Sequence, residues 1–313
     1  MKTIGIVILN YNNYSDTINC IKSVYKFCSS EELTLVIVDN GSNNNSIVEI
    51  SSFLKQCGRS YEITESNIII KKTTSEIILI KSNENLGYAR GNNLGIRFLI
   101  QQKVEHILVL NNDILLTNNL IKPLINSLNL NPTVGLISPI LMKDDTNIDY
   151  NCCRNNPTDN ILISESIKFL KIPMLNEIIA KKYFLKSNPE LILQEMIKCD
   201  IISGACILAK TSTWEQLNGF DENTFLYYEE NILYEKLKKL NLKMALLTCV
   251  SAIHLGAKST KVVQNTKLLS IELESLLYYL ENYRKINRFK IILIQFFRLF
   301  QIHILNTYNL VKK

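Results

Sequence analysis

The fold of this 313-residue chain is decided by a stretch near its beginning, Ile4-Gly5-Ile6-Val7-Ile8-Leu9-Asn10-Tyr11-Asn12. Six apolar or small residues without polar alternation are typical of a strand covered on both faces of a sheet. We interpret this run as a buried strand and not as a signal peptide, because no small-residue cleavage site follows it. No stretch of about 18 apolar residues occurs, so the sequence indicates no membrane-spanning helix.

Four further apolar runs of the same kind follow, at residues 33–38, 77–80, 107–110 and 134–138. Patterns with helical periodicity lie between the runs, at residues 15–27, 46–55, 89–101 and 119–128. Strands that alternate with helices in this way predict an α/β fold, in which helices flank both faces of a mostly parallel sheet.

Small polar residues follow each of the first four strands. The four segments are Asn10-Tyr11-Asn12, Asp39-Asn40-Gly41-Ser42, Asn83-Glu84-Asn85-Leu86-Gly87 and Asn111-Asn112-Asp113. Any one of them alone is an ordinary turn former. Ligands of parallel sheets bind beyond the carboxyl ends of the strands, so the four segments together predict one polar crevice.

The second half of the chain begins with a different pattern. Residues 144–200 are polar and then Lys-rich, and we interpret them as a helical insertion, or flap, over the crevice. Pro157, Pro173 and Pro189 should divide it into short helices. Residues 201–209 predict a strand kinked at Ser203-Gly204-Ala205, and the apolar residues 242–250 lead to His254. We expect one domain over residues 1–264 and a helical tail over residues 265–313.

The composition excludes several classes of protein. Hydrophobic residues make up 47% and charged residues 20% of the chain, which excludes a disordered or collagen-like chain. The eight Cys form no Cys-x-x-Cys pair, so no zinc ribbon or thioredoxin-type site is expected. Reduced core cysteines suit a cytoplasmic location. The adjacent Cys152 and Cys153 are either a redox pair or a chance pair in a loop.

The net charge of +6 is concentrated in the tail. Seven basic and no acidic residues follow Glu281, and the rest of the chain carries a net charge of −1. A neutral body argues against nucleic acid as a partner.

The tail also carries an apolar stripe at helical spacing, made of Ile286, Phe289, Leu293, Phe296, Phe297, Phe300 and Ile304. One interpretation is an amphipathic helix that binds an anionic membrane surface, with the protein peripheral on the inner face of the cytoplasmic membrane. The other is a helix that packs on the body or on a second subunit.

The ordered motifs resemble those of family 2 glycosyltransferases with the GT-A fold, of the rhamnosyltransferase-like kind that builds bacterial surface polysaccharides. The resemblance runs over about residues 3–260. Its segments, besides the four strand ends, are Tyr88-Ala89-Arg90-Gly91-Asn92-Asn93, Ser203-Gly204-Ala205-Cys206, Gly219-Phe220-Asp221-Glu222, Phe225-Leu226-Tyr227-Tyr228-Glu229-Glu230 and His254-Leu255-Gly256.

The resemblance implies an inverting transfer from a UDP- or dTDP-sugar, assisted by Mg²⁺ or Mn²⁺ at the leaving diphosphate. Asp113 corresponds to the metal-binding carboxylate of the family, and His254 to a position near the metal and diphosphate. The positions that correspond to nucleotide-sugar contacts are Asn10, Asn12, Asp39, Asn85, Gly87, Arg90, Asn111 and Asn112. Gly87 and Gly91 would allow close approach of the backbone, but Gly87, Gly91 and Gly95 also have the spacing of a small-residue helix face.

The general base of the family is an acidic residue at the start of a helix. Glu230 occupies that position here, and Glu229 is the alternative. The family's second acidic residue is replaced by Ile232, which either removes an acceptor contact or indicates weakened activity. Both Glu residues would also suit a helix N-terminus for structural reasons alone.

The acceptor side of the site corresponds to Ser203, Gly204 and Ala205 together with the flap. A saccharide, lipid-linked at the cytoplasmic membrane, is the expected acceptor. Two alternatives remain: a binding or scaffold member of the same fold without turnover, and a nucleotidyltransferase, which lacks its Gly-rich basic signature here.

Overall fold

The computed structural model describes residues 3–28, 32–66, 73, 75–256 and 266–311. Within them, ten strands form one sheet in the order β3-β4-β2-β1-β5-β11-β7-β12-β6, and β9 pairs with β12 outside this path. The strands are β1 (Ile4–Asn10), β2 (Leu33–Asp39), β3 (Tyr61–Glu65), β4 (Ile77–Lys81), β5 (His106–Asn111), β6 (Ile114–Leu116), β7 (Val134–Met142), β9 (Met196–Cys199), β11 (Cys206–Lys210) and β12 (Lys243–His254).

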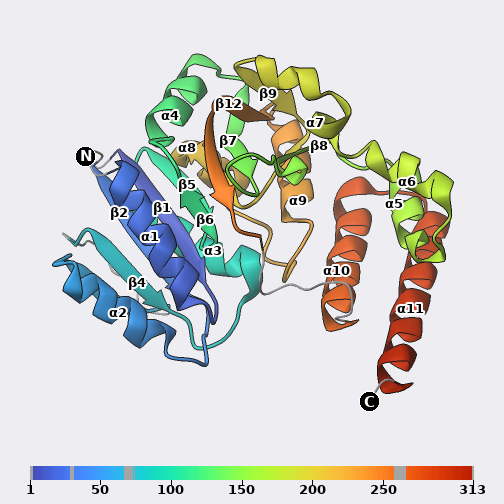
Figure 1. Cartoon of the computed structure of the whole chain (residues 1–313), viewed down its shortest axis with the longest axis horizontal. Helices are drawn as coiled ribbons and strands as arrows, with labels where there is room; N and C mark the ends of the chain where they lie inside the picture. Colours follow the sequence, from blue (N-terminus) through green and yellow to red (C-terminus); the bar gives the residue numbers. More distant parts are fainter. Residues whose placement is uncertain (1–2, 29–31, 67–72, 74, 257–265, 312–313) are drawn as a thin grey trace.

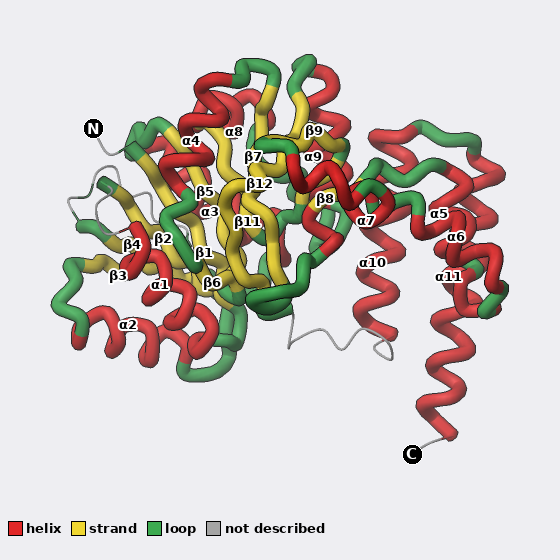
Figure 2. Tube along the Cα trace, turned by 45° about the horizontal axis from the view of Figure 1, so that its top comes forward, coloured by secondary structure: helices red, strands yellow, loops and turns green. Residues whose placement is uncertain are grey.

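The predicted α/β fold is confirmed. β1 lies between β2 and β5 and is parallel to both, while β11 is antiparallel to β5. Helices cover both faces of the sheet (Figures 1 and 2). They are α1 (Tyr14–Cys28), α2 (Ser46–Gln56), α3 (Gly87–Gln101), α4 (Ile121–Leu130), α8 (Thr211–Leu217) and α9 (Glu229–Lys239).

Successive residues of β1 serve two separate cores, as the period-2 geometry of a strand requires. Ile6 and Ile8 pack with α1, α2 and α4, whereas Val7 packs with α3, α8 and α9. The apolar run therefore lacks polar alternation because both of its faces are buried.

Helix α3 approaches β1 unusually closely. A Cβ atom on Gly91 would lie 2.6 Å from a methyl carbon of Leu9, and one on Gly95 would lie 2.5 Å from a methyl carbon of Val7. These glycines thus permit helix-on-strand packing, which is the structural one of the two interpretations of their spacing.

Three strands of the large sheet were absent from the prediction, and one predicted strand is divided. β3 alternates polar and apolar residues at a sheet edge, and β6 and β9 are only three and four residues long. The predicted strand 201–209 is two strands, β10 (Ile201–Ile202) and β11. It is interrupted because the backbone of Gly204 bonds to the side chains of Tyr88 and Glu230 instead of to a neighbouring strand.

The insertion is divided by its prolines as predicted. Its helices are α5 (Asp159–Ser166), α6 (Pro173–Ala180) and α7 (Phe184–Ser187), and a 3-10 turn starts at Pro189. A two-residue strand, β8 (Cys153–Arg154), pairs with β10. All eight cysteines are free, and both Cys152 and Cys153 are buried.

The tail folds into α10 (Thr266–Tyr279) and α11 (Arg288–Val311), which are joined in part by a π-helical turn (Leu280–Arg284). Both helices stand beside α5 and α6, away from the sheet (Figure 1). Asp159 of α5 pairs with Arg284 at 3.2 Å and with Lys290 at 2.8 Å, and Glu272 of α10 pairs with Arg298 at 3.3 Å. Some of the tail's basic residues therefore form ion pairs within the protein.

One helix among the described residues is long and apolar enough, by length and composition alone, to cross a membrane. It is the segment Arg288–Asn309 of α11. This helix is not evident as an uninterrupted apolar run in the sequence, because Arg288, Lys290 and Arg298 stand among its apolar residues.

Candidate active site

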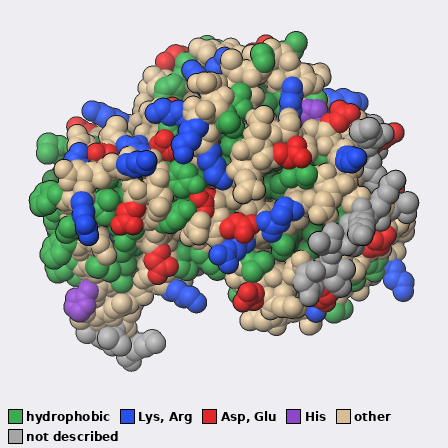
Figure 3. Space-filling view, turned by 180° about the vertical axis from the view of Figure 1, so that it is seen from behind, with side chains coloured by type: hydrophobic (Ala, Val, Ile, Leu, Met, Phe, Trp, Pro, Cys, Tyr) green, Lys and Arg blue, Asp and Glu red, His purple; other side chains and the backbone are tan. Residues whose placement is uncertain are grey.

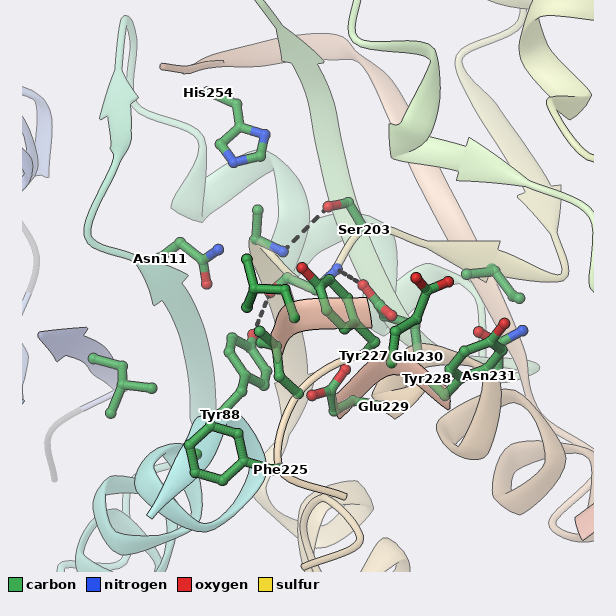
Figure 4. Close-up of a pocket in the computed structure, with 18 of the residues that line it drawn as sticks. Tyr88, Asn111, Ser203, Phe225, Tyr227, Tyr228, Glu229, Glu230, Asn231 and His254 are labelled. Atoms are coloured by element: carbon green, nitrogen blue, oxygen red, sulfur yellow. Dashed lines mark hydrogen bonds between the residues drawn. The ribbon is translucent and has the colours of Figure 1, made fainter. Parts of the chain in front are cut away.

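A cavity of about 640 Å³ opens at the carboxyl ends of β1 and β5. It is bounded by the sheet on one side and by the start of α9, the insertion and α10 on the others. Eleven of the fifteen predicted site residues line it: Asn85, Gly87, Asn111, Asn112, Asp113, Ser203, Gly204, Ala205, Glu229, Glu230 and His254. Figure 4 shows Asn111 and His254 on the sheet side of the cavity and Glu230 on the side of α9.

Asn10 and Asp39 do not line the cavity, because their side chains bind each other. The Asn10 amide donates to Asp39 Oδ2 at 2.7 Å, and Asp39 Oδ1 accepts from the Ser42 N–H at 3.1 Å. Thr17 donates to Asn10 Oδ1 at 2.7 Å. Both residues are buried, so this network fixes the ends of β1 and β2 relative to α1. Their predicted contact with the nucleotide base stays a prediction.

Asn12 and Arg90 also lie outside the cavity lining. Asn12 has a φ of 55°, and its side chain accepts from the N–H of Asn43. Arg90 is exposed and donates to the Glu222 carbonyl at 2.9 Å. In this arrangement each supports a loop at the rim of the site.

The turn before α3 is held by Asn85 and requires Gly87. Asn85 Oδ1 accepts from the amide of Asn40 at 2.9 Å and from the N–H of Gly87 at 3.0 Å. Gly87 has a φ of +80°, and a Cβ there would lie 2.3 Å from the carbonyl oxygen of Phe225. The turn thus brings α3 into contact with the segment that precedes α9.

Asn111 and Asn112 follow β5 and differ in their use. The Asn112 amide donates to Thr17 at 3.0 Å and to the Asn13 carbonyl at 3.3 Å, so it connects this turn to α1. The Asn111 N–H donates to the Ala205 carbonyl, and its side chain lines the cavity (Figure 4).

Asp113 and His254 form the end of the cavity nearest the sheet. His254 Nε2 lies 3.5 Å from Asp113 Oδ2, and His254 Nδ1 lies 3.3 Å from Asp149 Oδ2. Burial by itself lowers the pKa of His254, but the hydrogen bonds and charges of the two carboxylates outweigh it and raise the pKa to about 9. Without a bound cation this imidazole is therefore protonated at neutral pH.

Asp113 and His254 fit a divalent cation that takes most of its ligands from substrate and water. Asp113 Oδ1 is buried and has no hydrogen-bond partner. Among the described residues no group of three or more His, Cys, Asp or Glu side chains has an arrangement that could hold a metal ion by itself. Mg²⁺ and Mn²⁺ commonly take one or two protein ligands, and substrate phosphates and water supply the rest. One carboxylate beside one imidazole suits that use.

Glu230 is held by the backbone of the acceptor-side segment. Its Oε1 accepts from the N–H of Gly204 at 2.9 Å, and Arg154 Nη2 lies 3.7 Å from the same oxygen. The carbonyl of Gly204 accepts from Tyr88 Oη at 2.7 Å. These interactions fix the carboxylate at the cavity wall in front of α9 (Figure 4).

Glu229 lies deeper than Glu230. Desolvation by burial, followed by the charge of Glu230, raises its pKa to about 8. Its Oε1 has no hydrogen-bond partner. A group that is protonated at neutral pH is a poor general base there, so the structure favours Glu230 over Glu229 for that role.

The residues before α9 adopt a costly backbone conformation. Tyr227 and Tyr228 have φ values of 75° and 67°, in the left-handed region that side chains other than glycine rarely adopt. Each such residue costs about 1 kcal/mol or more. This backbone conformation directs the side chains of Glu229 and Glu230 toward the cavity. Tyr227 Oη is also buried at the cavity and has no hydrogen-bond partner.

Ile232 points away from the cavity. It is fully buried in a cluster with Leu162 of α5, Leu276 and Tyr279 of α10, and Ile294 of α11. An acidic residue would be unpaired in these apolar surroundings. The departure from the family pattern is thus explained by packing between α9 and the tail.

Several other residues that line the cavity were not predicted as site residues, among them Tyr88, Arg154, Tyr227 and Glu272. Tyr88 and Tyr227 lie inside the motifs, so the motifs could have suggested them. Arg154 and Glu272 come from the insertion and the tail, where the sequence offers no comparable signal. Trp214 is fully buried, donates to the Ile107 carbonyl at 3.3 Å and does not line the cavity, so it is a packing residue.

Sequence comparison gives two matches. The family described as "Glycosyl transferase family 2" matches residues 5–182. The chain is 28% identical, over 253 residues, to the low-salt glycan biosynthesis hexosyltransferase Agl10 of Haloferax volcanii. The match covers 80% of this chain and 66% of that archaeal relative.

Solved structures of glycosyltransferases share the fold. The mannosyltransferase PcManGT from Pyrobaculum calidifontis, in complex with GDP-Man and Mn²⁺, superposes with a TM-score of 0.57 at 14% identity, over 93% of this chain and 68% of its own. GalNAc-T7 with UDP, GalNAc and Mn²⁺ superposes with a TM-score of 0.56 at 13% identity, over 81% of this chain and 44% of its own. At these identities the likeness concerns the fold alone.

Proposed function

The chain belongs to glycosyl transferase family 2, and from that premise we propose that it is an inverting, metal-dependent hexosyltransferase. The observation that carries the proposal is the arrangement of the cavity. A metal-compatible carboxylate, Asp113, lines it on the sheet side, and an anchored carboxylate, Glu230, lines it on the side of α9. Two separate carboxylates are what single displacement requires, because the leaving group and the attacking hydroxyl stand on opposite sides of the sugar.

Glu230 is the general base in this proposal. It takes the proton of the acceptor hydroxyl while the hydroxyl oxygen forms a bond to the anomeric carbon and the bond to the diphosphate breaks. Attack from the face opposite the diphosphate inverts the anomeric configuration. The Gly204 N–H and Arg154 hold Glu230 in place, and the Tyr88 hydroxyl fixes Gly204 in turn.

Asp113 and His254 would hold Mg²⁺ or Mn²⁺. When bound, the cation supplies positive charge that stabilises the leaving diphosphate. Asp149 contacts the other nitrogen of His254, which orients the imidazole for that use.

We further propose a UDP- or dTDP-sugar as donor and a lipid-linked saccharide as acceptor. A role in surface polysaccharide synthesis at the cytoplasmic membrane face is consistent with the glycan-building role in the name of the archaeal relative. The solved structures that share the fold hold GDP-Man in one case and UDP in the other, so a donor screen includes both kinds of nucleotide.

The scaffold alternative rested on Ile232 and on Asn111. The burial of Ile232 among apolar side chains gives a packing reason for this residue and so removes one argument for the scaffold alternative. Asn111 leaves one carboxylate, Asp113, at this position. No further observation favours a protein without turnover.

A donor screen by thermal shift tests the proposal. UDP-, dTDP- and GDP-sugars are added with and without Mn²⁺, to the wild-type protein and to Asp113→Asn. A ligand at a hundredfold over its dissociation constant stabilises a protein by about 2.7 kcal/mol. We expect a Mn²⁺-dependent shift with one donor that Asp113→Asn abolishes. The absence of a shift with every nucleotide sugar would contradict the proposal.

A further inference from the structure

Exposed apolar side chains are concentrated in two segments that the transfer reaction does not use. Of the 17 large apolar side chains exposed among the described residues, nine lie within residues 170–174 and 289–304. Phe289 is 71%, Met174 64% and Phe296 61% exposed. The nine are Leu170, Ile172, Met174, Phe289, Ile292, Phe296, Leu299, Phe300 and Ile304. We call this set the apolar face.

The two segments lie side by side although they are more than 100 residues apart in sequence. The ring centroids of Phe169 and Phe300 are 5.9 Å apart. Helices α5, α6 and α11 stand together in two different views (Figures 1 and 2). Hydrophobic side chains with Lys and Arg among them gather at this end of the molecule (Figure 3). The apolar face is therefore a composite of the insertion and the tail.

Helix α11 is apolar on two opposite faces. Ile291 and Ile294 are buried against the body, whereas Phe289 and Phe296 point outward at helical spacing. One apolar stripe is enough to attach a helix to a protein. The outward stripe is mostly exposed and is thus not needed to attach α11 to the body.

Basic residues surround the apolar face. Exposed Lys168, Lys171, Lys181 and Lys186 lie in the insertion, and exposed Lys285 and Arg288 lie at the start of the tail. Glu177 is the one acidic residue in the sequence from 166 to 187, and none follows Glu281. Like charges oppose pairing of this face with a second copy of itself, while an anionic lipid bilayer offers both an apolar interior and opposite charge.

We propose that the apolar face is an in-plane binding surface for an anionic bilayer, formed jointly by the insertion and the tail. The proposal deepens the function proposed above and rests on it for the acceptor alone. α11 lies on the bilayer and does not cross it. Its inner side is attached to the protein through Lys290–Asp159, Arg298–Glu272 and the fully buried Ile294.

This surface adjoins the acceptor side of the cavity. Glu165 and Lys182 of the insertion and Leu268 and Glu272 of α10 line the cavity wall. The same elements carry or contact the apolar face. A protein resting on this face would thus have its acceptor side near the bilayer, and an acceptor whose lipid stays in the membrane could enter there.

Vesicle sedimentation of the full chain tests the proposal, with phosphatidylcholine vesicles that do or do not contain phosphatidylglycerol. Phe289→Gln/Phe296→Gln and, separately, Leu170→Gln/Met174→Gln should each weaken binding to the anionic vesicles by about tenfold. Lys168→Gln/Lys171→Gln should weaken it by about fivefold for each charge removed, and added salt should reproduce that loss.

Matched controls separate the face from apolar exposure in general. Val48→Gln/Leu130→Gln/Leu193→Gln changes three exposed apolar residues elsewhere and should leave vesicle binding unchanged. The proposal is overturned if the wild-type chain does not bind anionic vesicles, if the control loses as much binding as the face variants, or if the face variants instead convert a dimer into a monomer. Nucleotide-sugar binding is measured in the same samples. If the wild-type chain bound no nucleotide sugar, the proposed function would be contradicted and the vesicle result would still stand.

Discussion

Restoring the acidic residue of the family at position 232 should greatly lower the protein's free energy of unfolding and should not improve catalysis. Ile232 is fully buried against Leu162, Leu276 and Ile294. Truncation of a buried Ile costs about 2–5 kcal/mol, and an unpaired carboxylate adds several kcal/mol by desolvation. Ile232→Asp should therefore lower the free energy of unfolding by at least about 4 kcal/mol, a large part of the roughly 5–15 kcal/mol of a typical protein.

Urea unfolding measures this loss, and Ile232→Val is the control. The valine variant removes one methylene and should cost about 1 kcal/mol. The transfer rate of the Ile232→Val protein should equal that of the wild type, because the side chain does not line the cavity. If Ile232→Asp were as stable as the wild type and faster in transfer, the argument that α9 packs on the tail through this residue would be refuted.

Three further predictions follow from the cavity. Burial raises the pKa of Glu229 to about 8, so its contribution to stability is complete below its unfolded pKa of about 4.5 and is lost as the pH rises through 8. Glu229→Gln should therefore gain stability relative to the wild type by up to about 1.4 kcal/mol per pH unit between these two values. Urea unfolding at several pH values measures this, and a free energy of unfolding with the same pH dependence in both proteins would contradict it. Arg154→Met should lower the transfer rate by about fivefold, because it loses about 1 kcal/mol of ion pairing with Glu230. Donor binding, measured by calorimetry, should not change. An unchanged transfer rate would show that the ion pair does not contribute to catalysis. Gly87→Ala should lower the melting temperature, because φ is positive there and the added Cβ would clash with the Phe225 carbonyl oxygen. Gly58→Ala is the control for the positive φ alone, since it has open space around it, and it should lower the melting temperature less.

The sheet could be predicted because its central strands are buried on both faces. Ile6, Val7 and Ile8 satisfy two cores at once, which leaves an uninterrupted apolar run in the sequence. The edge strand β3 could not be found in the same way, since Tyr61–Glu65 alternates polar and apolar residues and is half exposed.

The location of the site could be predicted, but not the direction of each side chain. Polar residues at strand ends identify the crevice, yet Asn10 and Asp39 face each other because an amide and a carboxylate in adjacent parallel strands complement one another. Arg154 reaches Glu230 through a two-residue strand pairing with β10, and such a distant pairing leaves no local pattern. The role of Ile232 could not be predicted, because only its packing with the tail explains an apolar residue at this position.

The measurement that tests the central claim most directly is the transfer rate of Glu230→Gln beside that of Glu229→Gln. Glutamine keeps an oxygen that can accept the Gly204 N–H, so Glu230→Gln removes the basic charge and preserves the shape. Loss of a general base costs about 10²–10⁴ in rate. The account predicts a loss of that size in Glu230→Gln with an unchanged donor-induced thermal shift, and a smaller loss in Glu229→Gln. A Glu230→Gln protein that retains the wild-type rate would contradict it.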